Sequence, residues 1–260
     1  MIPYIQIPDL SLLGIKLHPF GILLAAAIYL GYFLARRRAR VLGLDVQLIS
    51  RGMRWMVAGA FVGGHLVEVL LYYPERALQN PLVLLAVWTG LSSFGGFLGA
   101  ALVMVLFFRR HGVSPLEHCD AIVYGLVPAW ILGRLGCAIV HDHPGLRSDF
   151  FLAVAYPGGA RHDLGFYELL LTVGLTLVLL AIRNRRPFPG FPTAVVLCLY
   201  APLRFALEFL RVSDRTYLGL TPAHYFAAGA LLLGLFLLAR GATRRRVPVI
   251  APLEQHSPAG

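Results

Sequence analysis

The chain has 260 residues, of which 58% are hydrophobic and only 14% are charged, with a mean hydropathy of +0.71. Soluble domains carry roughly 25% charged residues, so this composition excludes an ordinary soluble protein and indicates a polytopic membrane protein. The formal net charge is +10, but we expect it to reflect membrane topology and not a nucleic-acid partner. The three cysteines have no spacing typical of a disulfide framework.

Seven apolar segments are long enough to cross a bilayer. Six of them cover about residues 19–34, 53–73, 121–140, 164–182, 193–210 and 223–239. The third lies within 77–108, an uncharged run that a glycine-rich break at 90–96 interrupts, and we expect its helix to follow the break and end at Arg109-Arg110. The predicted fold class is therefore an all-α polytopic membrane protein with seven transmembrane helices. We expect residues 1–246 to form one membrane domain with a loop region at about 141–163 on the outer side of the membrane. Residues 247–260 are predicted to be a disordered cytoplasmic tail.

The arginines predict the orientation of these spans. Most of the basic residues flank one face of the predicted bundle, where spans one, three, five and seven end. They are Arg36, Arg37, Arg38, Arg40, Arg51, Arg54, Arg109, Arg110, Arg183, Arg185, Arg186, Arg240, Arg244, Arg245 and Arg246. Because Lys and Arg mark cytoplasmic loops, we expect a cytoplasmic C-terminus and an outside N-terminus.

Polar residues inside the spans gather at one depth. Counting along each span places them all in the outer half of the membrane; they are His65, Glu68, Arg134, Glu168, Arg204 and Glu208. A charged side chain in hydrocarbon costs from ~3 to more than 10 kcal/mol, so such residues usually serve a function. The clustering predicts a polar cavity that opens toward the outer leaflet beneath the 141–163 loop.

Two interpretations of the buried arginines remain open. Tyr200, Arg204 and Glu208 are spaced i, i+4, i+8 and form one stripe of a helix. Arg204 and Glu208 can simply neutralise each other, and Arg134 can be a structural partner of Glu68, Glu168 or Glu208. Alternatively the guanidinium groups form an anion site, because each can bind two phosphate oxygens at once.

The segment His141-Asp142-His143 also allows three interpretations. It can be a solvated loop, a metal site completed by His162-Asp163, or an Asp–His pair that supplies a general base. No recognised metal-ligand spacing is present, so we expect neither a metal nor a cofactor.

Six motifs together resemble one family, the bacterial prolipoprotein diacylglyceryl transferases. The motifs are Leu17-His18-Pro19-Phe20-Gly21, Gly63-Gly64-His65-Leu66, Trp88-Thr89-Gly90-Leu91-Ser92-Ser93-Phe94-Gly95-Gly96, Gly133-Arg134-Leu135-Gly136-Cys137, Tyr167-Glu168, and Tyr200-x3-Arg204-x3-Glu208-x2-Arg211-x2-Asp214. The last three are specific only in combination. The resemblance covers nearly the whole chain and agrees with seven spans and an outside N-terminus. It implies a location in the bacterial cell inner membrane, with the active site toward the periplasmic leaflet and the 141–163 loop region in the periplasm.

The resemblance implies a lipid transfer reaction. The diacylglyceryl group of phosphatidylglycerol would pass to the thiol of a prolipoprotein lipobox cysteine, and glycerol phosphate would leave. The partners would be phosphatidylglycerol, the prolipoprotein signal peptide and membrane lipids. The catalytic candidates are then Arg134, Arg204, Glu208, Asp142, His141 and His143. The candidates for phosphatidylglycerol binding are Arg134, Gly95, Gly96, Gly145, Tyr200, Arg204, Cys137 and Glu168.

Several residues depart from the family pattern. The family usually has asparagine at Cys137, glutamate at Asp142, histidine at Phe94, tyrosine at Phe20 and arginine at His65. A phenylalanine takes no proton, so any base role at position 94 is lost or passes to the 141–143 segment. Two other hypotheses stay open. One is a divergent paralogue that binds anionic phospholipid with another acceptor or no transfer, and the other is a membrane transporter.

Overall fold

The computed structural model describes residues 1–5, 7–8, 10–12, 15–87, 89–212 and 215–245. Seven helical segments within these ranges are long and apolar enough to cross a membrane, which confirms the predicted class of polytopic helical membrane protein. They are α1 (Pro19–Val41), α2 (Val46–Val67) with its continuation η1 (Glu68–Tyr72), α4 (Ser93–Arg110), α5 (Pro115–Val140), α6 (Leu164–Ala181), α7 (Phe191–Glu208) and α8 (Pro222–Arg245). The predicted tail at 247–260 and the motif residues Trp88 and Asp214 lie outside the described residues.

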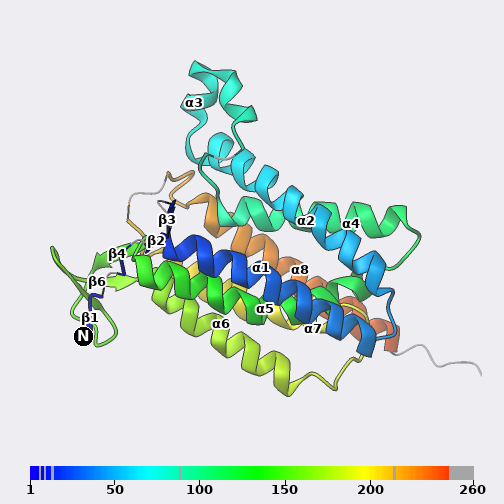
Figure 1. Ribbon diagram of the computed structural model, residues 1–260. Helices are drawn as coiled ribbons and strands as arrows, with labels where there is room; N and C mark the ends of the chain where they lie inside the picture. The colour runs from blue at the N-terminus through cyan, green and yellow to red at the C-terminus, as the bar shows by residue number, and fades with distance from the viewer. Residues whose placement is uncertain (6, 9, 13–14, 88, 213–214, 246–260) are drawn as a thin grey trace, which may run out of the picture.

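The helices pack in pairs. α1 runs along α5, α2 along α4, α7 along α8, and α6 lies against α5 (Figure 1). Glycines allow the closest approaches: a Cβ atom on Gly125 of α5 would lie 2.4 Å from the carbonyl oxygen of Gly31 on α1. Small residues at helix contacts are typical of membrane bundles, where dispersion contacts replace the hydrophobic effect as the force between helices.

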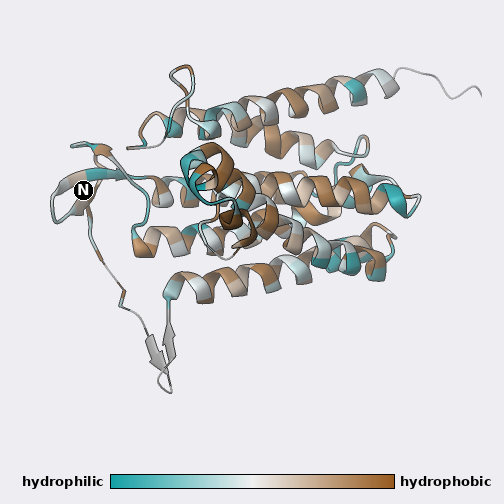
Figure 2. Ribbon diagram, turned by 90° about the horizontal axis from the view of Figure 1, so that it is seen from above, coloured by the Kyte–Doolittle hydropathy of each residue, from teal (hydrophilic) through white to brown (hydrophobic). Residues whose placement is uncertain are grey.

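The outward faces of the helices are apolar. Hydrophobic residues lie along the helices and hydrophilic residues gather toward their ends (Figure 2). Leu102 and Leu177 expose 60% and 62% of their surface. Apolar faces of this extent are expected against lipid.

Helix ends extend beyond the predicted spans where charged residues remain helical. The span predicted to end at 34 continues through Arg36, Arg38 and Arg40 to Val41. α2 begins before the predicted 53, because the Asp45 side chain accepts hydrogen bonds from the first backbone N–H groups and caps the helix. The apolar pattern therefore marks the hydrocarbon core and not the full helix.

The end of the bundle that carries the N-terminus holds the irregular structure. Here η1, α3 (Pro74–Gln79) and the 3-10 turn η2 (Pro81–Leu85) project from the bundle, as Figure 1 shows. A four-stranded sheet has the order β1 (Ile2–Pro3), β5 (Val154–Tyr156), β6 (Gly159–Asp163), β4 (Pro144–Arg147), and β2 (Leu10–Leu12) pairs with β3 (Ile15–Leu17). The predicted 141–163 loop is thus largely a sheet. Its strands are too short to show alternating hydrophobic and polar residues in the sequence. One edge strand of the sheet, β1, comes from the N-terminus.

Candidate functional site

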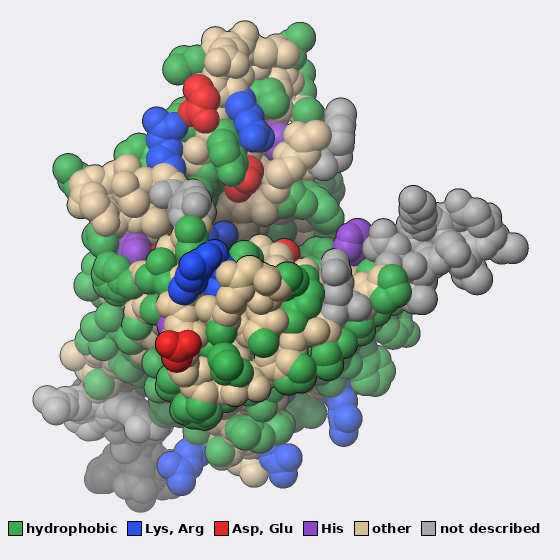
Figure 3. Space-filling model, turned by 90° about the vertical axis from the view of Figure 1, so that its left-hand side faces the viewer, with side chains coloured by type: hydrophobic (Ala, Val, Ile, Leu, Met, Phe, Trp, Pro, Cys, Tyr) green, Lys and Arg blue, Asp and Glu red, His purple; other side chains and the backbone are tan. Residues whose placement is uncertain are grey.

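A polar cavity of about 170 Å³ lies at the same end of the bundle. It is lined by Glu68, Tyr72, Tyr73, Leu91, Ser92, Ser93, Phe94, Arg134, His143, Glu168, Arg204 and Arg211. Acidic and basic side chains gather on this face of the molecule around a hollow (Figure 3). The ends of α2, α5 and α7 and the beginnings of α4 and α6 supply the lining. Four of the six polar residues predicted to gather at one depth line this cavity, and two do not: the four are Glu68, Arg134, Glu168 and Arg204, and the two are His65 and Glu208.

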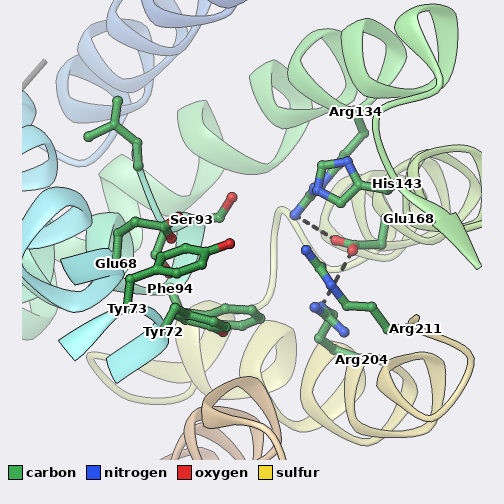
Figure 4. Close-up of a pocket in the computed structure, with 12 residues that line it drawn as sticks. Glu68, Tyr72, Tyr73, Ser93, Phe94, Arg134, His143, Glu168, Arg204 and Arg211 are labelled. Atoms are coloured by element: carbon green, nitrogen blue, oxygen red, sulfur yellow. Dashed lines mark ion pairs between the residues drawn. The ribbon is translucent and has the colours of Figure 1, made fainter. Parts of the chain in front are cut away.

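Glu168 lies between the two buried arginines (Figure 4). Its Oε2 atom is 2.6 Å from Nη2 of Arg134, and its Oε1 atom is 3.4 Å from Nε of Arg204. Arg204 also places Nη2 2.6 Å from Oε2 of Glu208, one helical turn along α7. All four side chains are buried. The two ion pairs considered from the sequence, Arg204 with Glu208 and Arg134 with a nearby glutamate, thus both occur. The Glu168 carboxylate joins them.

Three further side chains, those of Trp130, Tyr200 and Thr221, contact the ion-pair network. Tyr200 packs its ring 4.8 Å from that of Trp130, and Trp130 in turn lies 5.4 Å from the Arg134 guanidinium. Thr221 donates a hydrogen bond of 2.7 Å to Glu208. Tyr200 and Glu208 do not line the cavity, so they are placed to orient the arginines and not to touch a ligand in the described cavity.

Arg204 keeps hydrogen-bonding capacity in spite of its two carboxylate neighbours. Its Nη1 atom is buried without a hydrogen-bond partner among the described residues, and its Nε atom has only the 3.4 Å contact with Glu168. A buried donor left unsatisfied costs about 1–3 kcal/mol, so such an atom usually marks the place of a ligand or a water. Because guanidinium favours oxyanions, the arrangement is suited to a phosphate.

The opposite wall is aromatic and ends in a helix N-terminus. The Phe94 ring lies 4.9 Å from the Arg204 guanidinium carbon and stacks on Phe226 at 5.8 Å. Phe94 and Ser93 belong to the first turn of α4, where Ser92 caps the helix. The first turn of a helix carries partial positive charge, which adds to the attraction for an anion.

His141 lies outside the cavity. Its Nδ1 atom is 2.6 Å from Oδ2 of Asp163, and its Nε2 atom is 3.2 Å from the carbonyl oxygen of Ile5. Tyr4 stacks on the ring at 4.5 Å, and the Tyr156 hydroxyl donates to the same Asp163 oxygen. Burial and the Asp163 carboxylate raise the pKa of Tyr156, so it remains a donor here. This cluster fastens the N-terminal segment to the sheet.

The rest of the 141–143 segment lies nearer the arginines. His143 lines the cavity and contacts the Asp142 carboxylate through Nδ1. Cys137 is buried one turn beyond Arg134 on α5. The candidate ligand atoms of Cys137, Asp142 and His143 all lie within 4.8 Å of one another. The sequence spacing of these three residues did not reveal this group, because the αL backbone at His141 (φ 51°) turns the chain back after the helix.

The three candidate glycines do not line the cavity and lie at close backbone contacts. A Cβ atom on Gly95 would lie 2.3 Å from the Gly63 carbonyl oxygen, and one on Gly145 would lie 2.7 Å from the Leu210 carbonyl oxygen. Gly96 has ordinary room, with Ala60 O at 3.5 Å. The structure therefore gives Gly95 and Gly145 a packing role at the cavity edge.

Six lining residues were not assigned to the site by sequence reasoning: Tyr72, Tyr73, Leu91, Ser92, Ser93 and Arg211. Arg211 follows Glu208 in a quoted motif, so that spacing was the available signal. Tyr72 ends η1, a π-helical turn, and Tyr73 follows it directly; π-helical turns often occur at functional sites without a distinct sequence pattern. His65, which was expected to face the cavity, instead contacts the carbonyl oxygens of Val83 and Thr89 and holds the projecting segment.

Comparison with known proteins gives one consistent family. The family model described as prolipoprotein diacylglyceryl transferase matches residues 8–240. The phosphatidylglycerol–prolipoprotein diacylglyceryl transferase of Chromohalobacter salexigens is 33% identical over 256 residues, which cover 93% of this chain and 95% of the relative. The protein of the same name from Agrobacterium fabrum is 33% identical over 266 residues with the same coverage. The one from Pseudomonas paraeruginosa is 34% identical over 248 residues, or 91% of this chain and 90% of the relative.

Proposed function

The chain belongs to the prolipoprotein diacylglyceryl transferase family, and from that premise we propose the reaction that it catalyses. The protein transfers the diacylglyceryl group of phosphatidylglycerol to the thiol of a prolipoprotein lipobox cysteine. A thioether forms and glycerol phosphate leaves. The relatives' names support both substrates, and the seven apolar helices support a reaction that takes place within a membrane.

One observation carries the proposal for the donor lipid. Two buried arginines meet at Glu168, and Nη1 of Arg204 has no hydrogen-bond partner among the described residues at the same place. The cavity has room for a lipid headgroup and little more, so the acyl chains would lie beside the helices in the bilayer. An anionic phosphodiester supplies the acceptor oxygen that this Nη1 atom lacks.

The reaction places charge where the arginines lie. The thiolate sulfur attacks the glyceryl methylene that carries the phosphate, the S–C bond forms, and the C–O bond to phosphate breaks. Negative charge therefore grows on the leaving phosphate oxygen, and Arg134 and Arg204 stabilise it more strongly in the transition state than in the ground state. Glu168 and Glu208 act as positioning residues, because each fixes a guanidinium in the orientation observed.

The acceptor cysteine would approach from the side of His143 and Asp142. These residues lie at the cavity margin, close to solvent, whereas Phe94 on the opposite wall has no proton-accepting atom. Cys137 lies between this margin and Arg134 along α5. We assign His141 a structural role, since both of its ring nitrogens are engaged away from the cavity.

The distribution of arginines supports the proposed orientation, and the family supports a bacterial inner membrane. The arginine-rich helix ends lie at the opposite end of the bundle from the cavity, and positive residues mark the cytoplasmic side. The protein therefore lies in the bacterial inner membrane with its active site toward the periplasmic leaflet and its C-terminus in the cytoplasm.

The test is reconstitution of purified protein with phosphatidylglycerol and a lipobox peptide. We expect glycerol phosphate release together with a gain of one diacylglyceryl mass on the peptide. Phosphatidylethanolamine in place of phosphatidylglycerol, and a peptide with serine in place of the cysteine, serve as controls. Folded protein that gives neither product would overturn the proposed reaction, and binding of phosphatidylglycerol without product would favour the paralogue hypothesis.

A further inference from the structure

Three side chains of different chemistry converge at the margin of the cavity. Cys137 begins the last turn of α5 before the chain reverses, while Asp142 and His143 follow the reversal. Their candidate ligand atoms lie within 4.8 Å of one another, although four residues separate Cys137 from Asp142. The Cys137 side chain is buried, His143 is partly buried and Asp142 is exposed, so the group is closed on the protein side and open to an incoming ion.

The ligand set is typical of one metal. A thiolate, an imidazole and a carboxylate are the three side-chain types that bind Zn²⁺ in proteins. Ligand atoms around tetrahedral zinc lie about 3.5 Å apart, so side-chain adjustments of roughly an ångström would close the observed group. Catalytic zinc sites have three protein ligands and one open position, whereas structural sites have four. Three ligands beside a cavity therefore indicate a reactive site.

The charges also balance around such an ion. The Cys137 thiolate and the Asp142 carboxylate together neutralise Zn²⁺, and the neighbouring Arg134 has its own counter-ion in Glu168 at 2.6 Å. Arg134 therefore does not require either ligand for neutralisation. His143 lines the cavity, so the fourth position of an ion bound to it would lie at the cavity margin.

The reaction proposed above requires an activated thiol, and the cavity offers few groups for that purpose. Among the described lining residues, His143 is the only imidazole, and it shares a contact with Asp142. Phe94 occupies the opposite wall, and His141 is engaged with Asp163 and Ile5. A thiol bound to zinc loses its proton outright and remains nucleophilic, which makes a strong protein base unnecessary.

We propose that Cys137, Asp142 and His143 bind a zinc ion whose fourth position takes the sulfur of the acceptor cysteine. This inference rests on the proposed function for its catalytic part only. The thiol proton passes to solvent when the sulfur binds the metal. The sulfur lone pair then forms the S–C bond, the C–O electron pair leaves on glycerol phosphate, and zinc is neither oxidised nor consumed.

The first experiment measures metal alone. The full-length protein in detergent is loaded with Zn²⁺, desalted and analysed by mass spectrometry for metal per chain. We expect about one retained zinc per chain in the wild type and at least a tenfold loss in Cys137→Ser and Asp142→Asn. Cys198→Ser and Asp149→Asn are matched controls that should retain the metal, because Cys198 lies in α7 and Asp149 outside the ligand group.

Cobalt identifies the sulfur ligand directly. Co²⁺ loading should give the intense near-ultraviolet thiolate-to-cobalt absorption in the wild type and in Cys198→Ser, and no such band in Cys137→Ser. Asp142 is exposed, so Asp142→Asn should fold even if a buried Cys137 substitution does not. Wild-type protein that retains no more zinc than Asp142→Asn, or that lacks the thiolate band, overturns the metal site.

Activity separates this inference from the proposed function. We expect a chelator to lower the rate of transfer at least tenfold and added Zn²⁺ to restore it. Full transfer by metal-free protein overturns the metal inference and leaves the proposed reaction standing. Bound zinc with no transfer to any lipobox peptide overturns the proposed reaction and leaves the metal site standing. Bound zinc with transfer that the chelator does not change overturns thiol activation by the metal.

Discussion

Glu168 and Arg134 form a buried ion pair, with Oε2 of the carboxylate 2.6 Å from Nη2 of the guanidinium. The second carboxylate oxygen lies toward Arg204, which has Glu208 as a further partner. Removing one member of a buried pair costs about 3–5 kcal/mol, because the other charge stays buried and uncompensated. The network therefore contributes to folding as well as to the site. A substitution that keeps the charge is needed to separate an effect on the reaction from an effect on stability.

Arg204→Lys is the substitution that separates charge from geometry. Lysine keeps one positive charge, but a single ammonium cannot contact Glu168, Glu208 and a phosphate as the planar guanidinium can. We expect the initial rate of glycerol phosphate release to fall about 10–100-fold, and at least 100-fold in Arg204→Ala. Arg109→Lys, exposed at the other end of α4, should change neither rate nor thermal midpoint. Full activity in Arg204→Ala would remove the phosphate clamp from the mechanism.

Neighbouring glycines on α4 should respond differently to alanine. Gly95→Ala places a methyl group 2.3 Å from the Gly63 carbonyl oxygen and 2.5 Å from Val67 Cβ, so α2 and α4 must separate. We expect the thermal midpoint to fall and the transfer rate to decrease, since Phe94 and Ser93 of the same turn line the cavity. Gly96→Ala meets nothing closer than 3.5 Å and should be tolerated.

Gly174→Ala on α6 provides a second control for this pair, because no atom lies within 4 Å of the added Cβ. Helical glycine costs roughly 0.5–1 kcal/mol relative to alanine, so this variant should be neutral or slightly more stable. Equal thermal midpoints for Gly95→Ala and Gly96→Ala would show that the close approach of α2 and α4 does not limit stability.

The transmembrane spans and the depth of the polar residues could be predicted, because both depend only on the order of residues along each helix. A bilayer needs about 20 apolar residues per helix, and helical periodicity placed Tyr200, Arg204 and Glu208 on one stripe. The choice of Glu168 as the carboxylate between the arginines could not be made from the sequence. It depends on how α5, α6 and α7 pack, and Glu68 and Glu208 were equally available at the same depth.

The 141–163 segment was predicted least well, for a physical reason. The residues His141, Asp142 and His143 are adjacent in sequence, yet the left-handed turn at His141 directs the first toward the sheet and the third toward the cavity. Strand β1 at the N-terminus pairs with β5, a contact between distant parts of the chain. Backbone reversals and long-range pairing leave no periodic signal in a single sequence.

His141 and His143 should therefore separate stability from rate. His141→Asn keeps a residue that tolerates the left-handed backbone but loses the contact with Asp163, so we expect about 1–3 kcal/mol less stability. His143→Asn should keep the thermal midpoint and lower the transfer rate about 10–100-fold. The measurements are thermal unfolding and transfer rate per folded molecule. A larger rate loss in His141→Asn than in His143→Asn would reverse the two assigned roles.

Stability should also depend on pH through His162, which lies in β6 outside the membrane spans. Burial lowers the pKa of this histidine from its ordinary value of 6.5, and Nδ1 lies 2.8 Å from the Tyr167 hydroxyl. Below pH 6.5 the unfolded chain binds a proton at this position more readily than the folded chain. The contribution of neutral His162 to stability is therefore present above that pH and is lost as the pH falls toward the lowered value.

The corresponding measurement is the difference in thermal midpoint between the wild type and His162→Asn at about pH 8 and about pH 5.5. The wild type should lose stability relative to the variant at the lower pH, because asparagine does not titrate there. His111→Asn, at the opposite end of the bundle, is the matched control and should not change the pH response of the protein in the same way. A wild type that gains stability relative to His162→Asn on acidification would mean that the folded protein favours the charged imidazole at this position.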